Sequence, residues 1–302
     1  MKLGLVCISE ILKAQDKTLA FKAMTRAQYL KLGKIVALPE LSRRALHNCK
    51  LLSRIVLHCH SQGIAHYRVS SSMFPLITDS TLDLSLESLP DYANIVSALA
   101  SAGELARKLE VSVSMHPDQF NVLVSYNPLV ILRSINELNH QSHILDMMGY
   151  SQDLGSPMCL HLNATPKLEK ETLSQYRERF LTNLRRCSSG VQARLVLENE
   201  DKGYWNCSRL YETFGGDRAL VYDNHHDACN PSDPDMAHAF AETWGDSRPV
   251  FHWSEGIGGG RSHADYASHV PEIVSSLAER VTWEVELKAK DHAIARILGP
   301  RG

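Results

Sequence analysis

Short apolar stretches alternate along the chain with longer stretches whose apolar residues recur at helical spacing. The short stretches are typical of buried strands and cover residues 2–7, 64–69, 111–116, 158–162, 194–198, 219–223, 249–253 and 282–286. The longer stretches predict helices over residues 29–61, 92–109, 128–148, 173–187, 208–214, 235–242, 266–277 and 292–298. Eight strands alternating with eight helices, with no evident linker, predict a single α/β domain over residues 1–302, a (β/α)8 TIM barrel.

Residues with ligand chemistry close six of the predicted strands and help to choose between two α/β folds. In chain order they are His116, His161, Glu198, Asp223, His252 and Glu286, with His226 three residues beyond Asp223. An open, doubly wound sheet binds ligands at one switch point, whereas a closed parallel sheet brings every strand end to one mouth. The distribution therefore favours the barrel and predicts a metal site at its mouth.

The residue types in this set indicate which metal ions it suits. It combines imidazoles with carboxylates and contains no thiolate, because the seven cysteines form no CxxC pair and are expected to be small buried hydrophobes. Such nitrogen and oxygen ligands suit Zn²⁺ or Mn²⁺, and the share of oxygen favours Mn²⁺. The ligands outnumber those of one tetrahedral ion, so we expect two or three divalent ions. Clustered ions favour in-line displacement at phosphorus.

Bulk properties narrow the class of protein without fixing it. The net charge of −2 argues against a protein that holds nucleic acid by bulk positive charge, although bound divalent ions would supply local charge for a phosphate. No apolar run approaches the roughly 18 residues that cross a bilayer. The apolar start, residues 3–7, is too short for a secretory signal, so we expect a cytoplasmic protein. Nothing in the sequence predicts an obligate protein partner.

Six motifs together resemble those of the UV damage endonuclease family, which is related to endonuclease IV. They are YRVSSS (67–72), SMHPDQF (114–120), LENEDK (197–202), DNHH (223–226), RSHADY (261–266) and VELK (285–288). The resemblance runs over almost the whole chain. It implies a (β/α)8 barrel with up to three divalent ions that cleaves double-stranded DNA on the 5′ side of UV photoproducts. Abasic sites are a further substrate to be tested.

The resemblance also implies roles for individual residues. Expected metal ligands are Asp79, His116, His161, Glu198, Asp223, His226, His252, His263 and Glu286. Of these, Glu198, Glu286, His252 and His263 are the expected catalytic residues, with Glu198 as the bridging carboxylate. Gln119 and Phe120 are expected to probe the damaged dinucleotide, because an amide and a planar ring can fill the gap left by displaced bases. Candidate contacts to the DNA backbone are Lys17, Arg68, Lys202 and Arg261.

The chain departs from the family pattern at three positions. Asp79 stands where the family usually has a histidine, and aspartate can still coordinate a third ion. Val250 stands where many members have a lysine, so that lysine's role is lost. Leu5, which we also expect to contact the lesion, stands where some members have an aromatic ring, which would shift damage probing toward Phe120.

Two other functions remain compatible with a metal-binding barrel, since a fold does not fix a function. One is a metal-dependent sugar isomerase of the xylose-isomerase-like group, which would use fewer ions. The other is a binding protein that uses the mouth as a platform without turnover. Assays with aldoses and ketoses, and binding that resists chelators, would identify them.

Overall fold

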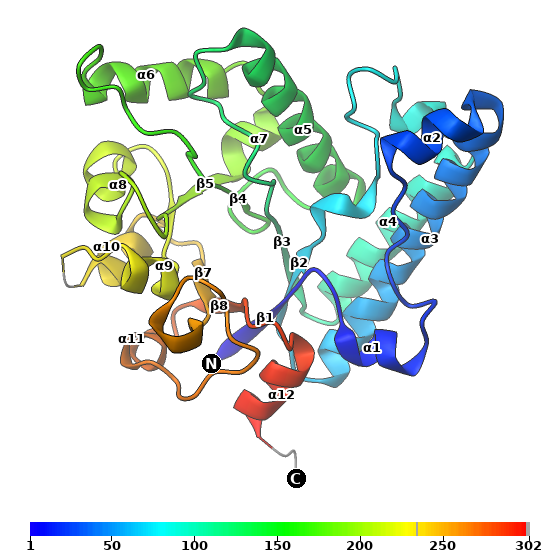
Figure 1. The fold of residues 1–302 in the computed structure, drawn as a ribbon. Coiled ribbons are helices and arrows are strands. Elements are labelled where there is room, and N and C mark those ends of the chain that lie inside the picture. Colours follow the sequence, from blue (N-terminus) through cyan, green and yellow to red (C-terminus); the bar gives the residue numbers. More distant parts are fainter. Residues whose placement is uncertain (234, 300–302) are drawn as a thin grey trace.

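A parallel β-barrel forms the centre of the computed structural model, which describes residues 1–233 and 235–299 (Figure 1). Its strands are β1 (Lys2–Val6), β2 (His66–Val69), β3 (Ser112–Met115), β4 (Met158–Leu160), β5 (Leu195–Glu198), β6 (Leu220–Val221), β7 (Val250–Trp253) and β8 (Thr282–Val285). They pair in the order β6-β5-β4-β3-β2-β1-β8-β7. The predicted TIM barrel is therefore confirmed.

The barrel closes between its two edge strands, β6 and β7. The amide of His252 donates a hydrogen bond to the carbonyl oxygen of Tyr222 at 3.0 Å, and Asp223 and His252 form an isolated parallel bridge. β6 is shorter than the sequence predicts because Asp223 leaves the strand to cap the following helix. Closure at this point brings two expected metal ligands side by side.

Helices surround the sheet and connect successive strands (Figure 1). They are α1 (Glu10–Gln15), α2 (Arg26–Leu32), α3 (Lys34–Ser61), α4 (Tyr92–Lys108), α5 (Pro128–Met147), α6 (Leu173–Leu184), α7 (Ser189–Arg194), α8 (Cys207–Phe214), α9 (Asn224–Cys229), α10 (Met236–Glu242), α11 (Glu272–Ser276) and α12 (Asp291–Leu298), with 3-10 turns η1 (Ser71–Met73), η2 (Leu86–Ser88) and η3 (Ile257–Gly259). No described helix is both long enough and apolar enough to span a bilayer.

Two predicted helices differ most from those in the structure, each for a local backbone reason. The helix expected over 29–61 is two helices, because Gly33 takes a φ of 71° that suits glycine and breaks the helical path. The first begins at a capping box in which Thr25 and Gln28 satisfy each other's backbone amides. The helix expected over 266–277 is only α11, because Pro271 precedes it and disfavours helix in the residue before it.

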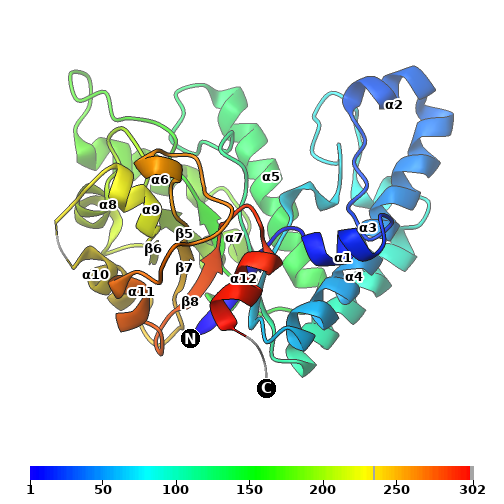
Figure 2. The ribbon, with the colours of Figure 1, turned by 60° about the horizontal axis from the view of Figure 1, so that its bottom comes forward.

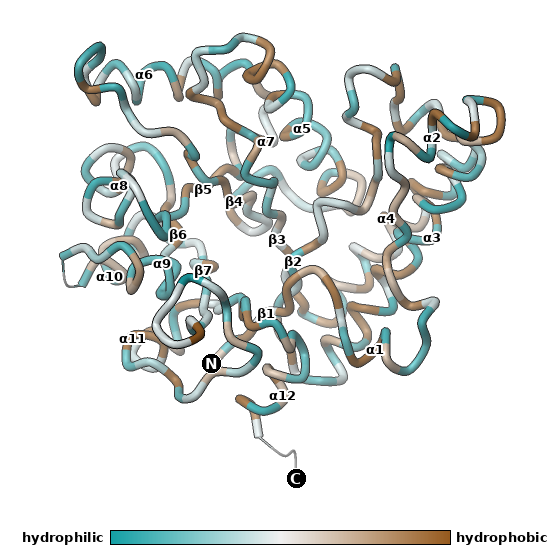
Figure 3. The backbone as a smooth tube through the Cα atoms, in the orientation of Figure 1, coloured by the Kyte–Doolittle hydropathy of each residue, from teal (hydrophilic) through white to brown (hydrophobic). Residues whose placement is uncertain are grey.

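The strands are almost wholly buried, whereas the segment around α9, beyond the carboxyl end of β6, is largely hydrophilic (Figure 3). Every residue of β2, β5, β7 and β8 is buried, as expected for a parallel sheet covered on its outer face by helices. α3 runs antiparallel to these strands and is unusually long, with 28 residues. Its first turns and α2 therefore stand beyond the strand ends on the mouth side (Figure 2).

Candidate metal centre at the barrel mouth

Neighbouring strands deliver the expected ligands to one place at the mouth. His116 and His161 follow β3 and β4, Glu198 ends β5, and His252 lies in β7. Asp223 caps α9: its Oδ1 accepts hydrogen bonds from the amides of His225 and His226, both at 2.7 Å. Because one oxygen of Asp223 is used by the helix, the other is left to face the centre.

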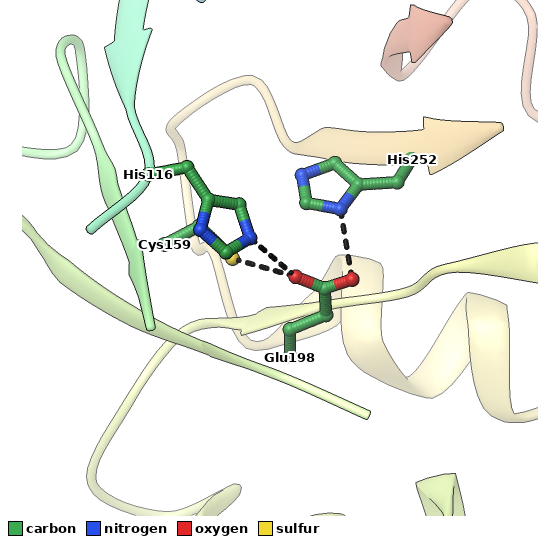
Figure 4. Close-up of side chains that lie close together, drawn as sticks. All are labelled: His116, Cys159, Glu198 and His252. Atoms are coloured by element: carbon green, nitrogen blue, oxygen red, sulfur yellow. Dashed lines mark hydrogen bonds and ion pairs between the residues drawn. The ribbon is translucent and has the colours of Figure 1, made fainter. Parts of the chain in front are cut away.

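The carboxylate of Glu198 is the hub of this centre, and its side chain is 1% exposed. Its Oε2 lies 2.9 Å from Nε2 of His116 and 3.4 Å from Nε2 of His161. Its Oε1 lies 2.9 Å from Nδ1 of His252 and 3.1 Å from Nδ1 of His226. Figure 4 shows His116 at one oxygen of the carboxylate and His252 at the other. A carboxylate shared in this way can bridge two cations.

One carboxylate oxygen buried at the centre has no hydrogen-bond partner among the described residues. It is Oδ2 of Asp223, which lies 3.9 Å from Nδ1 of His252. Burying such an atom unsatisfied costs free energy, and a bound cation would satisfy it. Three groups of side chains bring their ligand atoms within 4.8 Å of one another: His116, Cys159, Glu198 and His252; Glu198, Asp223 and His226; and His252, Glu284 and Glu286. These donors fit divalent metal ions.

Without bound metal, protonated histidines balance the negative charge of the carboxylates at the centre. Burial alone would raise the pKa of Glu198, but the charge of His252 and the hydrogen bonds from His116 and His226 hold it well below its usual value. Burial opposes the charge on His252, yet the Glu198 carboxylate raises its pKa to about 10. Asp223 and Glu198 likewise overcome burial and raise the pKa of His226 to about 11. Burial lowers the pKa of His161 to about 4, so this imidazole is neutral and ready to coordinate.

A second layer of polar side chains lies inside the barrel below the centre. Glu284 of β8 binds Arg68 and Ser114, and its Oε1 lies 2.9 Å from Nε2 of His66. Its Oε2 also lies 3.2 Å from Nε2 of His252, which joins the two layers. The guanidinium of Arg68 reaches Oε1 of Glu286 at 2.5 Å. Burial would raise the pKa values of both glutamates, but Arg68 holds them low, at about 2 for Glu286.

Several expected site residues lie outside the cluster at the mouth. His263 is at its edge: its Nδ1 lies 3.9 Å from Oε2 of Glu286 and 2.7 Å from the backbone oxygen of the same residue. Asp79 is not brought to the cluster. Its carboxylate accepts hydrogen bonds from Thr81 and lies 3.6 Å from Nε of Arg26. The structure therefore gives Asp79 protein partners in place of a shared ligand position.

The expected DNA contacts divide into exposed and buried side chains. Phe120 is 76% exposed, and Gln119, Lys17 and Lys202 are also exposed, while Arg261 lies 3.6 Å from Asp201 at the surface. Two expectations need correction. Leu5 is fully buried in β1, and Arg68 is 6% exposed and bound by two carboxylates, so neither side chain is placed to contact DNA.

The sequence interpretation missed Cys159 and Glu284. Cys159 donates from its thiol to Oε2 of Glu198 at 3.2 Å, and burial together with that carboxylate raises its pKa, so it is a thiol in the metal-free protein. Strand alternation was the available signal. Cys159 precedes His161 by two residues and Glu284 precedes Glu286 by two, so each pair shares one face of its strand.

The fold and the site define a TIM-barrel protein whose mouth carries a buried histidine and carboxylate cluster suited to divalent cations. The family model described as UV-endonuclease UvdE matches residues 1–299. The chain belongs to the UV-endonuclease UvdE family and is an endonuclease of UV-damaged DNA.

Individual relatives agree with this assignment. The chain is 29% identical to the UV DNA damage endonuclease of Nostoc sp., over 98% of this chain and 89% of that protein. It is 30% identical to the UV-damage endonuclease of Schizosaccharomyces pombe, over 74% of this chain but only 36% of that longer protein.

Solved structures agree on the fold. The crystal structure of SacUVDE superposes with a TM-score of 0.78 at 22% identity, covering 99% of this chain and 98% of that one. A D-psicose 3-epimerase from Clostridium cellulolyticum superposes with a TM-score of 0.52 at 8% identity, which indicates a shared barrel only. The sugar-isomerase alternative is therefore not favoured.

Proposed function

We propose that this endonuclease depends on divalent metal ions and cuts the phosphodiester bond immediately 5′ to UV photoproducts in double-stranded DNA. The observation that carries the proposal is the Glu198 carboxylate, which faces four imidazoles while Oδ2 of Asp223 has no hydrogen-bond partner among the described residues. A buried site of this kind gains more from cations than from the protons that it would otherwise need.

The proposed ion sites use the ligands that meet at the mouth. Glu198 bridges, and the remaining ligands are His116, His161, Asp223, His226, His252, His263 and Glu286. Two or three divalent ions fit this number of donors, and the carboxylates among them favour Mn²⁺. When bound, the ions would polarise the phosphate and lower the pKa of water in the site. The chain's own part is to fix the ligand geometry and to exclude bulk water from the buried side of the phosphate.

Residues beside the centre are proposed to recognise the lesion. Gln119 and Phe120 follow His116 by three and four residues, so they lie on the loop that leaves the metal centre. Phe120 packs little against the protein, and its exposed ring is free to stack on bases. The same loop therefore couples recognition of distorted DNA to the position of the scissile phosphate. DNA as substrate places the enzyme inside the cell, and we propose the cytoplasm, without an obligate protein partner.

The decisive experiment uses a duplex with one cyclobutane pyrimidine dimer at a known position. Full-length protein is incubated with this duplex, with the undamaged duplex and with one that carries an abasic site, each with EDTA and after Mn²⁺ add-back. We expect one nick immediately 5′ to the dimer, its loss in EDTA and its recovery with Mn²⁺. Nicking that persists in EDTA, or cuts placed elsewhere, would contradict the proposal. The abasic duplex tells whether recognition extends beyond photoproducts.

A further inference from the structure

Positive charge is concentrated in one segment of a chain that is acidic elsewhere. Residues 13–54 contain ten of the 32 lysines and arginines but only two of the 34 acidic residues. The rest of the chain thus has 22 basic and 32 acidic residues. A duplex approaching the protein would be repelled by most of the molecule and attracted to this segment.

The fold places the tip of this segment beside the barrel mouth. α3 spans about 42 Å, whereas a four-residue strand such as β2 spans about 13 Å. The chain passes from the end of α3 to the start of β2 at the end of the barrel opposite the mouth. The excess length of α3 therefore projects on the mouth side. There it meets α2 at Gly33, and Figure 2 shows this corner standing clear of the strand ends. We call residues 26–36 the α2–α3 corner.

A groove lies between the α2–α3 corner and the loop after β3, which leaves the centre. It has a volume of about 810 Å³ and is lined by Arg26 of the corner, by Gln119 and Phe120 of that loop, and by Arg133 of α5. Its wall also carries the carboxylates of Asp79, Asp118 and Glu137, and Asp79 lies 3.6 Å from Nε of Arg26. A nucleic acid bound at the mouth would thus pass from the loop with Phe120 across this groove to the corner.

The surface of the corner combines lysines with exposed apolar side chains. Lys31 and Lys34 are exposed, and neither forms an ion pair with any residue in 1–233 or 235–299. Ile35 is 91% exposed, and Leu30, Leu32 and Val36 are also exposed, which gives the apolar stretch visible where α2 turns into α3 (Figure 3). The core-facing side of α3 begins only at Ala37 and Leu41. These apolar residues therefore contribute nothing to the protein core.

We propose that the α2–α3 corner grips undamaged duplex beside the lesion, with Lys31 and Lys34 on phosphates and Ile35 packed in the minor groove. The inference rests on the proposed function, because it assumes that DNA lies across the mouth. Lysines flanking an apolar wedge are a combination suited to backbone contact and groove packing. The corner supplies affinity without reading the lesion, and the loop with Phe120 supplies discrimination.

The test is binding of an undamaged 30-base-pair duplex by full-length protein in Mn²⁺, measured by fluorescence anisotropy over a potassium chloride series. The variant is Lys31→Gln/Lys34→Gln. Its matched control is Lys2→Gln/Lys108→Gln, two exposed lysines at the opposite end of the barrel, where β1 begins and α4 ends. Each lost phosphate contact lowers the slope of log affinity against log salt by about 0.9. We expect the corner variant to lose about two units of slope and more than about tenfold in affinity, and the control to match wild type.

A second variant separates groove packing from charge. Ile35→Ser should weaken binding about tenfold while leaving the salt slope unchanged, because it removes apolar contact alone. A corner variant whose slope equals that of wild type would overturn the proposal. So would analytical ultracentrifugation showing that Ile35→Ser abolishes self-association while DNA binding is unaffected, since the corner would then dock a second copy. Failure of wild type to nick a dimer-containing duplex would refute the proposed function, whereas the binding curves on undamaged DNA still decide the role of the corner.

Discussion

Replacing Glu198 with glutamine tests the centre at the atom on which it converges. The substitution keeps the shape of the side chain but removes its charge and leaves an amide nitrogen that cannot accept a hydrogen bond or coordinate a metal. One oxygen faces His116 and His161, and the other faces His252 and His226. The amide nitrogen therefore replaces the oxygen that one of these two pairs of imidazoles contacts. Whichever way the amide turns, the bridge between the two halves of the centre is lost.

The size of the effect follows from burial. The Glu198 carboxylate helps to raise the pKa of His252 to about 10 and that of His226 to about 11. Removing one partner from a buried ion pair costs roughly 3–5 kcal/mol, which is a large part of the roughly 5–15 kcal/mol that keeps a domain folded. We therefore expect the metal-free variant to unfold at a temperature lower by on the order of 10 °C.

Metal content and nicking are measured on the same preparations. After dialysis against limiting Mn²⁺, inductively coupled plasma mass spectrometry should find at least one ion fewer per chain than in wild type. Nicking of irradiated plasmid should fall by at least about 10³-fold, equivalent to about 4 kcal/mol of transition-state stabilisation. Glu212→Gln, an exposed glutamate on α8, is the matched control and should behave as wild type. Full metal content together with wild-type nicking in Glu198→Gln would refute the bridging role.

Four further outcomes follow from other parts of the site. Because the pKa of His252 is raised from 6.5 to about 10, its contribution to the stability of metal-free protein is complete below pH 6.5 and is lost toward pH 10; urea titrations in EDTA should show this decline, and saturating Mn²⁺ should remove it. Arg68→Ala should lower the free energy of unfolding by roughly 3–5 kcal/mol, because it strands two buried carboxylates, whereas exposed Arg43→Ala should change it by under about 1 kcal/mol in the same urea assay. Phe120→Ala should leave the unfolding midpoint unchanged but reduce the ratio of affinities for damaged and undamaged duplex in anisotropy measurements. Asp79→Ala should keep wild-type metal content by mass spectrometry, because its carboxylate lies with Arg26 and Thr81 outside the cluster.

The positions of the strand ends could be predicted from the sequence because histidine and acidic residues interrupt the buried apolar runs there. His116, His161 and Glu198 each follow residues that are apolar or small, and the barrel closes so that these positions meet. The pairing of β6 with β7 was not predictable, because β6 is only two residues long and its closure depends on the cap that Asp223 makes for α9. The sequence therefore indicates which residues converge, but it does not give their distances.

The inner layer was harder to predict because polar residues within a strand resemble functional surface residues. Arg68 lies in the motif YRVSSS, where the sequence alone favours a cation that contacts the DNA backbone. Alternation from His66 places it inside the barrel, but only the partner strand shows why a buried guanidinium is tolerated. Glu284 and Glu286 come from the opposite end of the chain, across the β1 strand. Long-range charge pairing of this kind is invisible in any local window.

Val250 acquires a physical meaning from this layer. It precedes His252 by two residues, so its side chain is on the same strand face, but it pairs with Thr282, one step below Glu284, which pairs with His252. A lysine at position 250 would place one more cation below these carboxylates, but here Arg68 already binds both Glu284 and Glu286. Glu284 also has His66 and His252 as partners, so it is not left uncompensated by valine. The charge balance beneath the centre is thus complete without a lysine at position 250.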